Sequence, residues 1–193
     1  EVGVFVMTEN GLREAKNPSA LFLSGREREA TGSVVLVTQE GTRPLLVEVQ
    51  GLLDQTSFLN PRRLCVGLDS QRLVLLLAIL QRHGGVVVSG HDVFVNVAGG
   101  IRIGESAADV AIAAAILSSL LDKPFPTDTV CFGEIGLVGE IRPVPRGQER
   151  LKEAAKLGFS RAIIPVGNRI LDKIEGLEII QIKRIEDLVS WLS

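Results

Sequence analysis

The sequence predicts a mixed α/β fold, α+β in its arrangement, with β-hairpins near the N-terminus and alternating strands and helices later. Short runs rich in Val, Ile and Leu come in pairs before residue 100, and beyond residue 128 similar runs alternate with helix-like segments. The chain has 193 residues, of which 46% are apolar, so it can bury a core of its own. We therefore expect helices packed against a largely one-sided sheet.

The first 32 residues differ in character from the rest. Glu1 to Met7 alternates like a strand but has no sheet partner nearby, and Asn17-Pro18-Ser19 can start a short helix in an otherwise polar, turn-rich stretch. We expect residues 1–32 to be the end of a preceding domain plus a linker, and residues 33–193 to form the compact domain.

Two pairs of strand-like runs, each around a turn of glycine and polar residues, predict two β-hairpins. The first hairpin joins residues 34–37 to 44–49, and the second joins residues 86–88 to 93–97.

Two helices are predicted in the first 125 residues. The apolar run Leu73–Leu80 follows Asp69 or Ser70 as its N-cap and ends before Gly84-Gly85. Because this run is apolar on every side, we expect it to be buried between layers. The longest helix spans about residues 105–121, and its many alanines let a neighbouring element approach closely.

The C-terminal third alternates strands with helices. In chain order, the expected elements are a strand at 129–132, a glycine-punctuated turn at 133–139, a short strand around Ile141, a helix at 148–157, strands at 161–165 and 177–182, and a helix at 185–192.

The charge of the chain is uneven, although its formal net charge is only −2. Residues 61–102 carry five basic side chains against two aspartates, and all five are arginines, whose planar guanidinium suits phosphate. This local excess of +3 makes DNA a candidate partner that the average charge conceals. The candidate DNA-binding residues are Arg62, Arg63, Arg72, Arg82 and Arg102. Arg62 and Arg63 are the preferred pair, because a Pro-Arg-Arg loop leaves side chains free to project.

Several standard sites are missing from the sequence. It has no Gly-x-x-x-x-Gly-Lys-[Ser/Thr] loop for nucleotide phosphates. Its two histidines, His83 and His91, and its two cysteines, Cys65 and Cys131, have no partners at metal-ligand spacing. We expect no ATP, magnesium or zinc site in this chain.

Residues 99–165 carry the most specific pattern. A glycine-rich approach, Gly99-Gly-Ile-Arg-Ile-Gly104, leads into the alanine-rich helix, and Gly133-Glu-Ile-Gly-Leu-Val-Gly139 leads into a helix containing Arg150. This succession resembles the proteolytic domain of Lon proteases, which implies a ribosomal protein S5 domain 2-like fold. Lon proteases use a serine–lysine dyad, in which a lysine takes the proton of the serine.

The resemblance places the serine position at Ala107 and the lysine position at Arg150. Alanine has no nucleophile, and arginine cannot act as a base at neutral pH. We therefore expect no catalytic residue and no peptidase activity. An active dyad using Ser106 with Lys152 is the alternative, but it requires rotations of about 100° and 200° on their helices. A capping or first-turn role for Ser106 is favoured.

Long collinear segments also resemble the C-terminal part of the RadA (Sms) family of bacterial DNA-repair proteins. They are Leu21-Phe-Leu-Ser-Gly-Arg-Glu27, Phe58-Leu-Asn-Pro-Arg-Arg63, Val95-Asn-Val-Ala-Gly-Gly100 and Gly133 to Pro145, while residues 3–12 resemble the exit of that family's RecA-like ATPase core.

This resemblance implies an inactive Lon-like domain attached to a DNA-dependent ATPase that promotes branch migration in recombinational repair. It also implies a cytoplasmic homohexameric ring that contacts single-stranded or branched DNA, with a recombinase filament as a further partner and no membrane. ATP, magnesium and zinc would be held by upstream domains. A pure oligomerisation module without DNA contact remains an alternative, as does the Ser106 peptidase.

Overall fold

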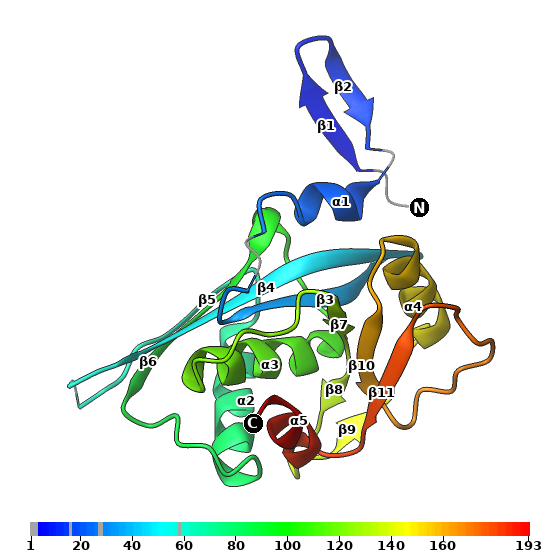
Figure 1. Ribbon diagram of the computed structural model, residues 1–193. Coiled ribbons are helices and arrows are strands. Elements are labelled where there is room, and N and C mark those ends of the chain that lie inside the picture. Colours follow the sequence, from blue (N-terminus) through cyan, green and yellow to red (C-terminus); the bar gives the residue numbers. More distant parts are fainter. Residues whose placement is uncertain (1–3, 16, 27–28, 58) are drawn as a thin grey trace.

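The structure is a computed structural model that describes residues 4–15, 17–26, 29–57 and 59–193 (Figure 1). Its main sheet has seven strands in the order β11-β10-β7-β3-β4-β6-β5. They are β3 (Ser33–Glu40), β4 (Arg43–Gln55), β5 (Arg63–Val66), β6 (His91–Val97), β7 (Thr129–Cys131), β10 (Arg161–Pro165) and β11 (Glu178–Ile182). Only β4 runs antiparallel to its two neighbours in this sheet, and the remaining pairs are parallel. The mixed α/β prediction is confirmed.

The first predicted hairpin is confirmed, and the second is wrong. β3 and β4 pair antiparallel from Ser33 opposite Gln50 to Glu40 opposite Arg43. Residues 86–88 form no strand. Instead, β6 pairs with the far half of the 13-residue β4 and, on its other side, with β5. The sequence analysis did not predict β5, and it placed the first residue of this strand, Arg63, in a loop.

Two short hairpins lie outside the main sheet. β1 (Phe5–Thr8) pairs with β2 (Gly11–Glu14), so the first predicted strand has a local partner after all; residues 1–3 of that prediction lie outside the described residues. β8 (Glu134–Ile135) pairs with β9 (Ile141–Arg142) across the glycine-punctuated turn.

Five α-helices are found in the described residues. They are α1 (Pro18–Phe22), α2 (Ser70–Arg82), α3 (Asp109–Leu120), α4 (Gly147–Lys156) and α5 (Ile185–Leu192). The N-cap of α2 is Asp69, one of the two predicted candidates, and its side chain accepts a hydrogen bond from the Arg72 amide. The prediction that α2 is buried on all sides is wrong, because Val74 and Leu75 are exposed while the opposite face packs on the core.

α3 is the central helix of the core, and nearly all of its residues are buried. It is preceded by a 3₁₀ turn over Ser106–Ala108 and starts a few residues later than predicted. A Cβ on Gly51 of β4 would lie only 2.8 Å from the Ala115 carbonyl carbon, so backbone packs directly on backbone here. This is the close approach that the alanine-rich sequence predicted.

Both faces of the central sheet are covered. In Figure 1, α2, α3 and α5 lie below the sheet, and α1 and α4 lie on the opposite side. The side chains of Val34, Val35, Leu36 and Val37 point alternately to the two faces, yet all four are fully buried. The sequence analysis expected a sheet covered largely on one face, and that expectation is wrong, because both faces are covered.

The short helix α1 packs on the main sheet. Its buried Ser19 hydroxyl accepts a hydrogen bond from the Leu46 amide of β4 at 3.0 Å. The boundary at residue 33 stays a prediction, but α1 contacts the domain that follows it. Among the described residues, no helix is both long enough and apolar enough to cross a membrane.

The contacts of Asp128, the residue before β7, should make the stability of the fold depend on pH in the acid range. Its carboxylate accepts hydrogen bonds from Arg161 and Ser160, and these contacts lower its pKa to about 2 from the ordinary 3.8. Because the folded-state pKa is depressed, this pairing stabilises the fold above pH 3.8 and loses its effect as the pH falls through about 2.

We therefore expect Asp128→Asn to flatten the acid side of the stability curve. Urea denaturation from about pH 5 to about pH 2 should show a smaller loss of stability in this variant than in the wild type. Parallel curves for the two proteins would contradict the assignment.

Candidate functional site

The two positions that the sequence analysis assigned to the Lon dyad lie in different elements, the 3₁₀ turn before α3 and the helix α4. Ala107 is buried in the 3₁₀ turn before α3, and Arg150 is buried in α4 with 1% of its surface exposed. A methyl group and a guanidinium thus occupy the positions where a hydroxyl and an amine would react.

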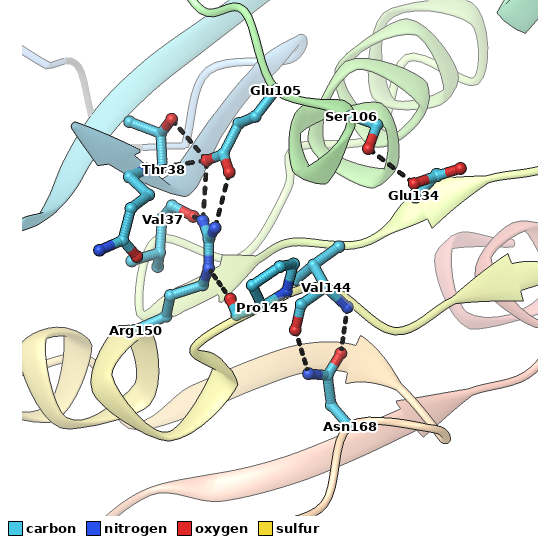
Figure 2. A network of polar contacts seen from close by, with 10 residues as sticks. Val37, Thr38, Glu105, Ser106, Glu134, Val144, Pro145, Arg150 and Asn168 are labelled. Atoms are coloured by element: carbon cyan, nitrogen blue, oxygen red, sulfur yellow. Dashed lines mark hydrogen bonds and ion pairs between the residues drawn. The ribbon is translucent and has the colours of Figure 1, made fainter. Parts of the chain in front are cut away.

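Arg150 is held by a dense set of hydrogen bonds (Figure 2). Its Nη1 and Nη2 donate to the two carboxylate oxygens of Glu105 at 2.9 and 2.7 Å. It also donates to the Val37 carbonyl at 2.6 Å and the Pro145 carbonyl at 3.1 Å. The guanidinium carbon lies 5.6 Å from the centroid of the Phe132 ring. This bidentate geometry is one that arginine provides and lysine does not.

Glu105 completes the network from the other side. Its carboxylate also accepts hydrogen bonds from the Thr38 hydroxyl at 2.8 Å and the Gln39 amide at 2.7 Å. Burial disfavours its ionised form, but the hydrogen bonds and charge of Arg150, with Thr38 and Gln39, outweigh burial and hold its pKa below the ordinary value. The pair therefore joins β3, α4 and the segment before α3.

Ser106 does not form a dyad with Lys152. Its hydroxyl donates to Glu134 at 2.7 Å, on the other side of the 3₁₀ turn from Arg150 (Figure 2). The Lys152 ammonium lies 3.4 Å from Asp172 and is mostly exposed. The structure thus gives Ser106 a carboxylate acceptor and pairs Lys152, the candidate lysine, with another residue.

A cavity of about 470 Å³ lies beside Ser106, between the first turns of α2 and α3. Its charged lining includes Arg72, Asp109 and Glu134. No lysine and no histidine is among the described residues that line it. The cavity thus offers a serine hydroxyl but no amine or imidazole base to activate it.

Arg72 is a structural partner of α3. Its guanidinium donates to both carboxylate oxygens of the buried Asp109 and to the Ile135 carbonyl at 2.7 Å. The hydrogen bond to Asp109 raises the pKa of Arg72 above its ordinary value, so the guanidinium stays charged. This candidate DNA-binding residue is therefore largely committed to holding α2, α3 and β8 together.

The side chains of Arg62 and Arg63 do not project freely from a loop, as the sequence analysis expected, but contact other protein groups. The Arg62 guanidinium pairs with Asp92, lies 5.3 Å from the Phe94 ring centroid and keeps 61% of its side chain exposed. Arg63 begins β5 and donates to the carbonyls of His91 and Val88. The Arg62 contacts also hold the pKa of Asp92 below its ordinary value.

Arg82 and Arg102 are the two candidate DNA-binding residues whose side chains are exposed and form no ion pair within the described residues. Both are exposed, Arg82 in the last turn of α2 and Arg102 in the segment after β6. No carboxylate in the described part of the chain lies within ion-pair distance of either one. The five sequence candidates therefore divide into Arg82 and Arg102, which are unpaired, Arg62, which is paired but exposed, and Arg63 and Arg72, which are engaged by protein groups.

The sequence analysis missed the acidic members of the site. Glu105, Asp109 and Glu134 each bind a residue that it did single out. One signal in the sequence could have revealed two of them, because Glu105 and Asp109 lie on either side of the Ser-Ala-Ala segment that begins the buried helix. A carboxylate is rarely buried without a cationic or hydrogen-bonding partner, so each of these acids predicts such a partner.

Comparisons with known proteins agree with the fold and the sequence pattern. The family described as "Subunit ChlI of Mg-chelatase" matches residues 75–168, which include α3, β7 and α4. The chain is 54% identical over 192 residues to the DNA repair protein RadA of Haemophilus influenzae. It is 55% identical over 190 residues to that of Escherichia coli and 46% identical over 191 residues to that of Bacillus subtilis.

These matches cover 97–100% of this chain but only 41–42% of each relative, so the chain spans about two fifths of the length of the curated relatives. Over nearly its whole length, the chain thus matches the C-terminal part of the DNA repair protein RadA.

Proposed function

We propose that this chain is the scaffold and DNA-contacting part of a hexameric, DNA-dependent ATPase that promotes branch migration in recombinational DNA repair. The observation that carries the DNA contact is a set of exposed arginine side chains, Arg62, Arg82 and Arg102, within the one segment of the chain that has an arginine-only excess of positive charge. The names of the relatives support repair as the process in which it acts.

The arrangement of the arginines suits sequence-independent binding. Guanidinium groups neutralise backbone phosphates and release counterions, so such binding should weaken steeply with salt. In a homohexameric ring, a few arginines per subunit form a continuous positive collar, although each subunit has a net charge of −2. Single-stranded or branched DNA is the proposed ligand, and a recombinase filament is a further proposed partner.

The same proposal assigns catalysis to other parts of the parent protein. ATP, magnesium and zinc would be held outside this chain, in a protein that works in the cytoplasm and away from membranes. Within the chain, the Arg150–Glu105 pair is proposed to be structural, so this domain would not cleave peptides.

Replacing Arg82 and Arg102 by alanine tests the DNA contact most cleanly, because neither residue pairs with a carboxylate of the described chain. We expect the double variant to bind DNA of any sequence more weakly and to reduce the slope of log K against log salt by about 2. Fluorescence anisotropy with labelled single-stranded and duplex oligonucleotides measures both quantities.

A matched control removes two other exposed cations, Lys156 and Lys183, and should leave the slope close to that of the wild type. Binding by the wild type that does not change with salt would contradict phosphate contact. The Arg62→Ala, Arg63→Ala variant should also weaken binding, but it needs a parallel stability measurement, because it leaves the buried Asp92 without its cation.

A further inference from the structure

We propose that a second basic surface, formed by Arg43, Arg146 and Arg169, binds the phosphate backbone of nucleic acid. These three arginines lie far apart in the sequence and outside the arginine-only segment 61–102. They come from the start of β4, the N-cap of α4 and the loop between β10 and β11. The inference rests on the proposed DNA-contacting function and adds a separate contact surface to it.

The first link joins Arg146 to the β3–β4 turn. Nη1 of Arg146 donates to the Thr42 carbonyl at 3.0 Å, next to Arg43. This bond uses one of the five guanidinium donors, and among the described residues no other partner of the group is seen, so the remaining donors can bind a ligand. Arg43 is partly exposed and Arg146 is exposed.

The second link joins the β10–β11 loop to the start of α4. Asn168 is buried, accepts a hydrogen bond from the Val144 amide at 3.1 Å and donates to the Val144 carbonyl at 2.8 Å (Figure 2). A Cβ on Gly147 would lie 2.6 Å from the Asn168 side-chain nitrogen. Arg146 and Arg169 adjoin these two contacting residues in the chain, so the loop is fixed with Arg169 near Arg146.

A further contact keeps this loop in place. The Gln148 side chain accepts a hydrogen bond from the Leu171 amide at 3.0 Å and donates to the Asp172 carbonyl at 3.0 Å. The β3–β4 turn, α4 and the β10–β11 loop all lie on the right side of Figure 1. The three arginines are thus presented by anchored backbone.

The charges of this surface, like those of Arg82 and Arg102, are not neutralised by carboxylates of the described chain. Six arginines of the described chain form ion pairs with carboxylates, namely Arg62, Arg72, Arg142, Arg150, Arg161 and Arg184. Arg43, Arg146 and Arg169 do not pair with any carboxylate of the described residues, although Glu40 and Glu149 are near them in the chain. Three exposed or partly exposed arginines on neighbouring segments, without counter-charges in the described chain, fit a polyanion, and phosphate is the anion whose geometry arginine matches best.

The test compares two triple variants of the full chain that each lose three positive charges. Arg43→Ala, Arg146→Ala, Arg169→Ala removes the proposed surface, and Arg13→Ala, Lys156→Ala, Lys183→Ala removes three other exposed cations. With a fluorescein-labelled duplex and a single strand, we expect the first variant to lose affinity about tenfold or more at low salt. It should also reduce the slope of log K against log salt by about 3, while the second variant stays near the wild type.

The outcomes separate this inference from the proposed function. Equal binding by the two triple variants, with the wild type still binding DNA, would overturn the second surface but leave DNA contact through Arg82 and Arg102 in place. No salt-sensitive DNA binding by the wild type would overturn both. Loss of poly-glutamate binding with unchanged DNA binding would instead assign the surface to an acidic protein partner. Urea midpoints equal to that of the wild type confirm that each variant is folded.

Discussion

Replacing Arg150 by methionine is expected to lower the free energy of unfolding by about 3–5 kcal/mol. The substitution removes a buried cation and leaves the Glu105 carboxylate without its bidentate partner, while the carbonyls of Val37 and Pro145 lose a donor. Breaking one side of a buried pair costs far more than the net strength of the pair itself. Urea denaturation followed by circular dichroism measures the loss.

Lys152→Ala is the matched control for this prediction. It lies on the same helix and also removes a cation from an ion pair, but that pair is exposed, so the change should stay within about 1 kcal/mol. The double variant Arg150→Met, Glu105→Gln should recover part of the loss, because no unpaired charge remains. An Arg150→Met protein as stable as the Lys152→Ala protein would show that the pair does not hold the fold.

Replacing Gly51 by alanine is expected to destabilise the fold by about 1–3 kcal/mol. The added methyl carbon would lie 2.8 and 2.9 Å from the carbonyl carbon and oxygen of Ala115, and backbone of a buried helix cannot move away as a flexible side chain can. α3 would have to shift from β4, along the line of closest packing in the core.

Gly104→Ala is the control for Gly51→Ala. A Cβ on Gly104 meets nothing within 4 Å, so its replacement should change the stability by no more than about 0.5 kcal/mol. The urea midpoints of the two variants make the comparison. Equal midpoints would mean that α3 does not rest on the glycine of β4 as closely as the structure shows.

Much of the fold follows from local pattern. The β3–β4 hairpin, the N-cap of α2 at Asp69 and the strand–helix alternation after residue 128 were all predictable, because turn residues and apolar periodicity act over a few neighbouring positions. The second hairpin was not, because β6 can pair with the long β4 instead of with residues 86–88, and local sequence does not decide between the two.

The candidate site shows the same division. The assignment of the dyad positions to Ala107 and Arg150 rests on one-dimensional register and stays a prediction. The partner of Arg150 could not, because Glu105 lies 45 residues away in the sequence and meets it only through the fold. Likewise, five arginines clustered in the sequence proved unequal in space, since Arg63 and Arg72 satisfy carbonyls and a buried carboxylate while Arg102 stays open.

The basic surface of Arg43, Arg146 and Arg169 shows the opposite relation, because these arginines are separated in the sequence but lie on neighbouring segments of the fold. Counting charge along the chain finds runs of arginine, but it cannot find three isolated arginines that a hairpin turn, a helix start and an anchored loop bring together. Such surfaces follow from tertiary structure alone.

We propose that this domain has no serine–lysine catalytic centre and that the residues at the assigned dyad positions, Ala107 and Arg150, build structure instead. Labelling of the folded chain by a serine-reactive fluorophosphonate, followed by intact-mass analysis and a casein-cleavage assay on the same sample, tests this most directly. Because Ser106 donates to Glu134, and no lysine is among the described residues that line the cavity beside it, we predict neither an adduct nor casein turnover, with the Ser106→Ala variant indistinguishable from the wild type. An adduct and casein turnover that both disappear in Ser106→Ala would contradict the account.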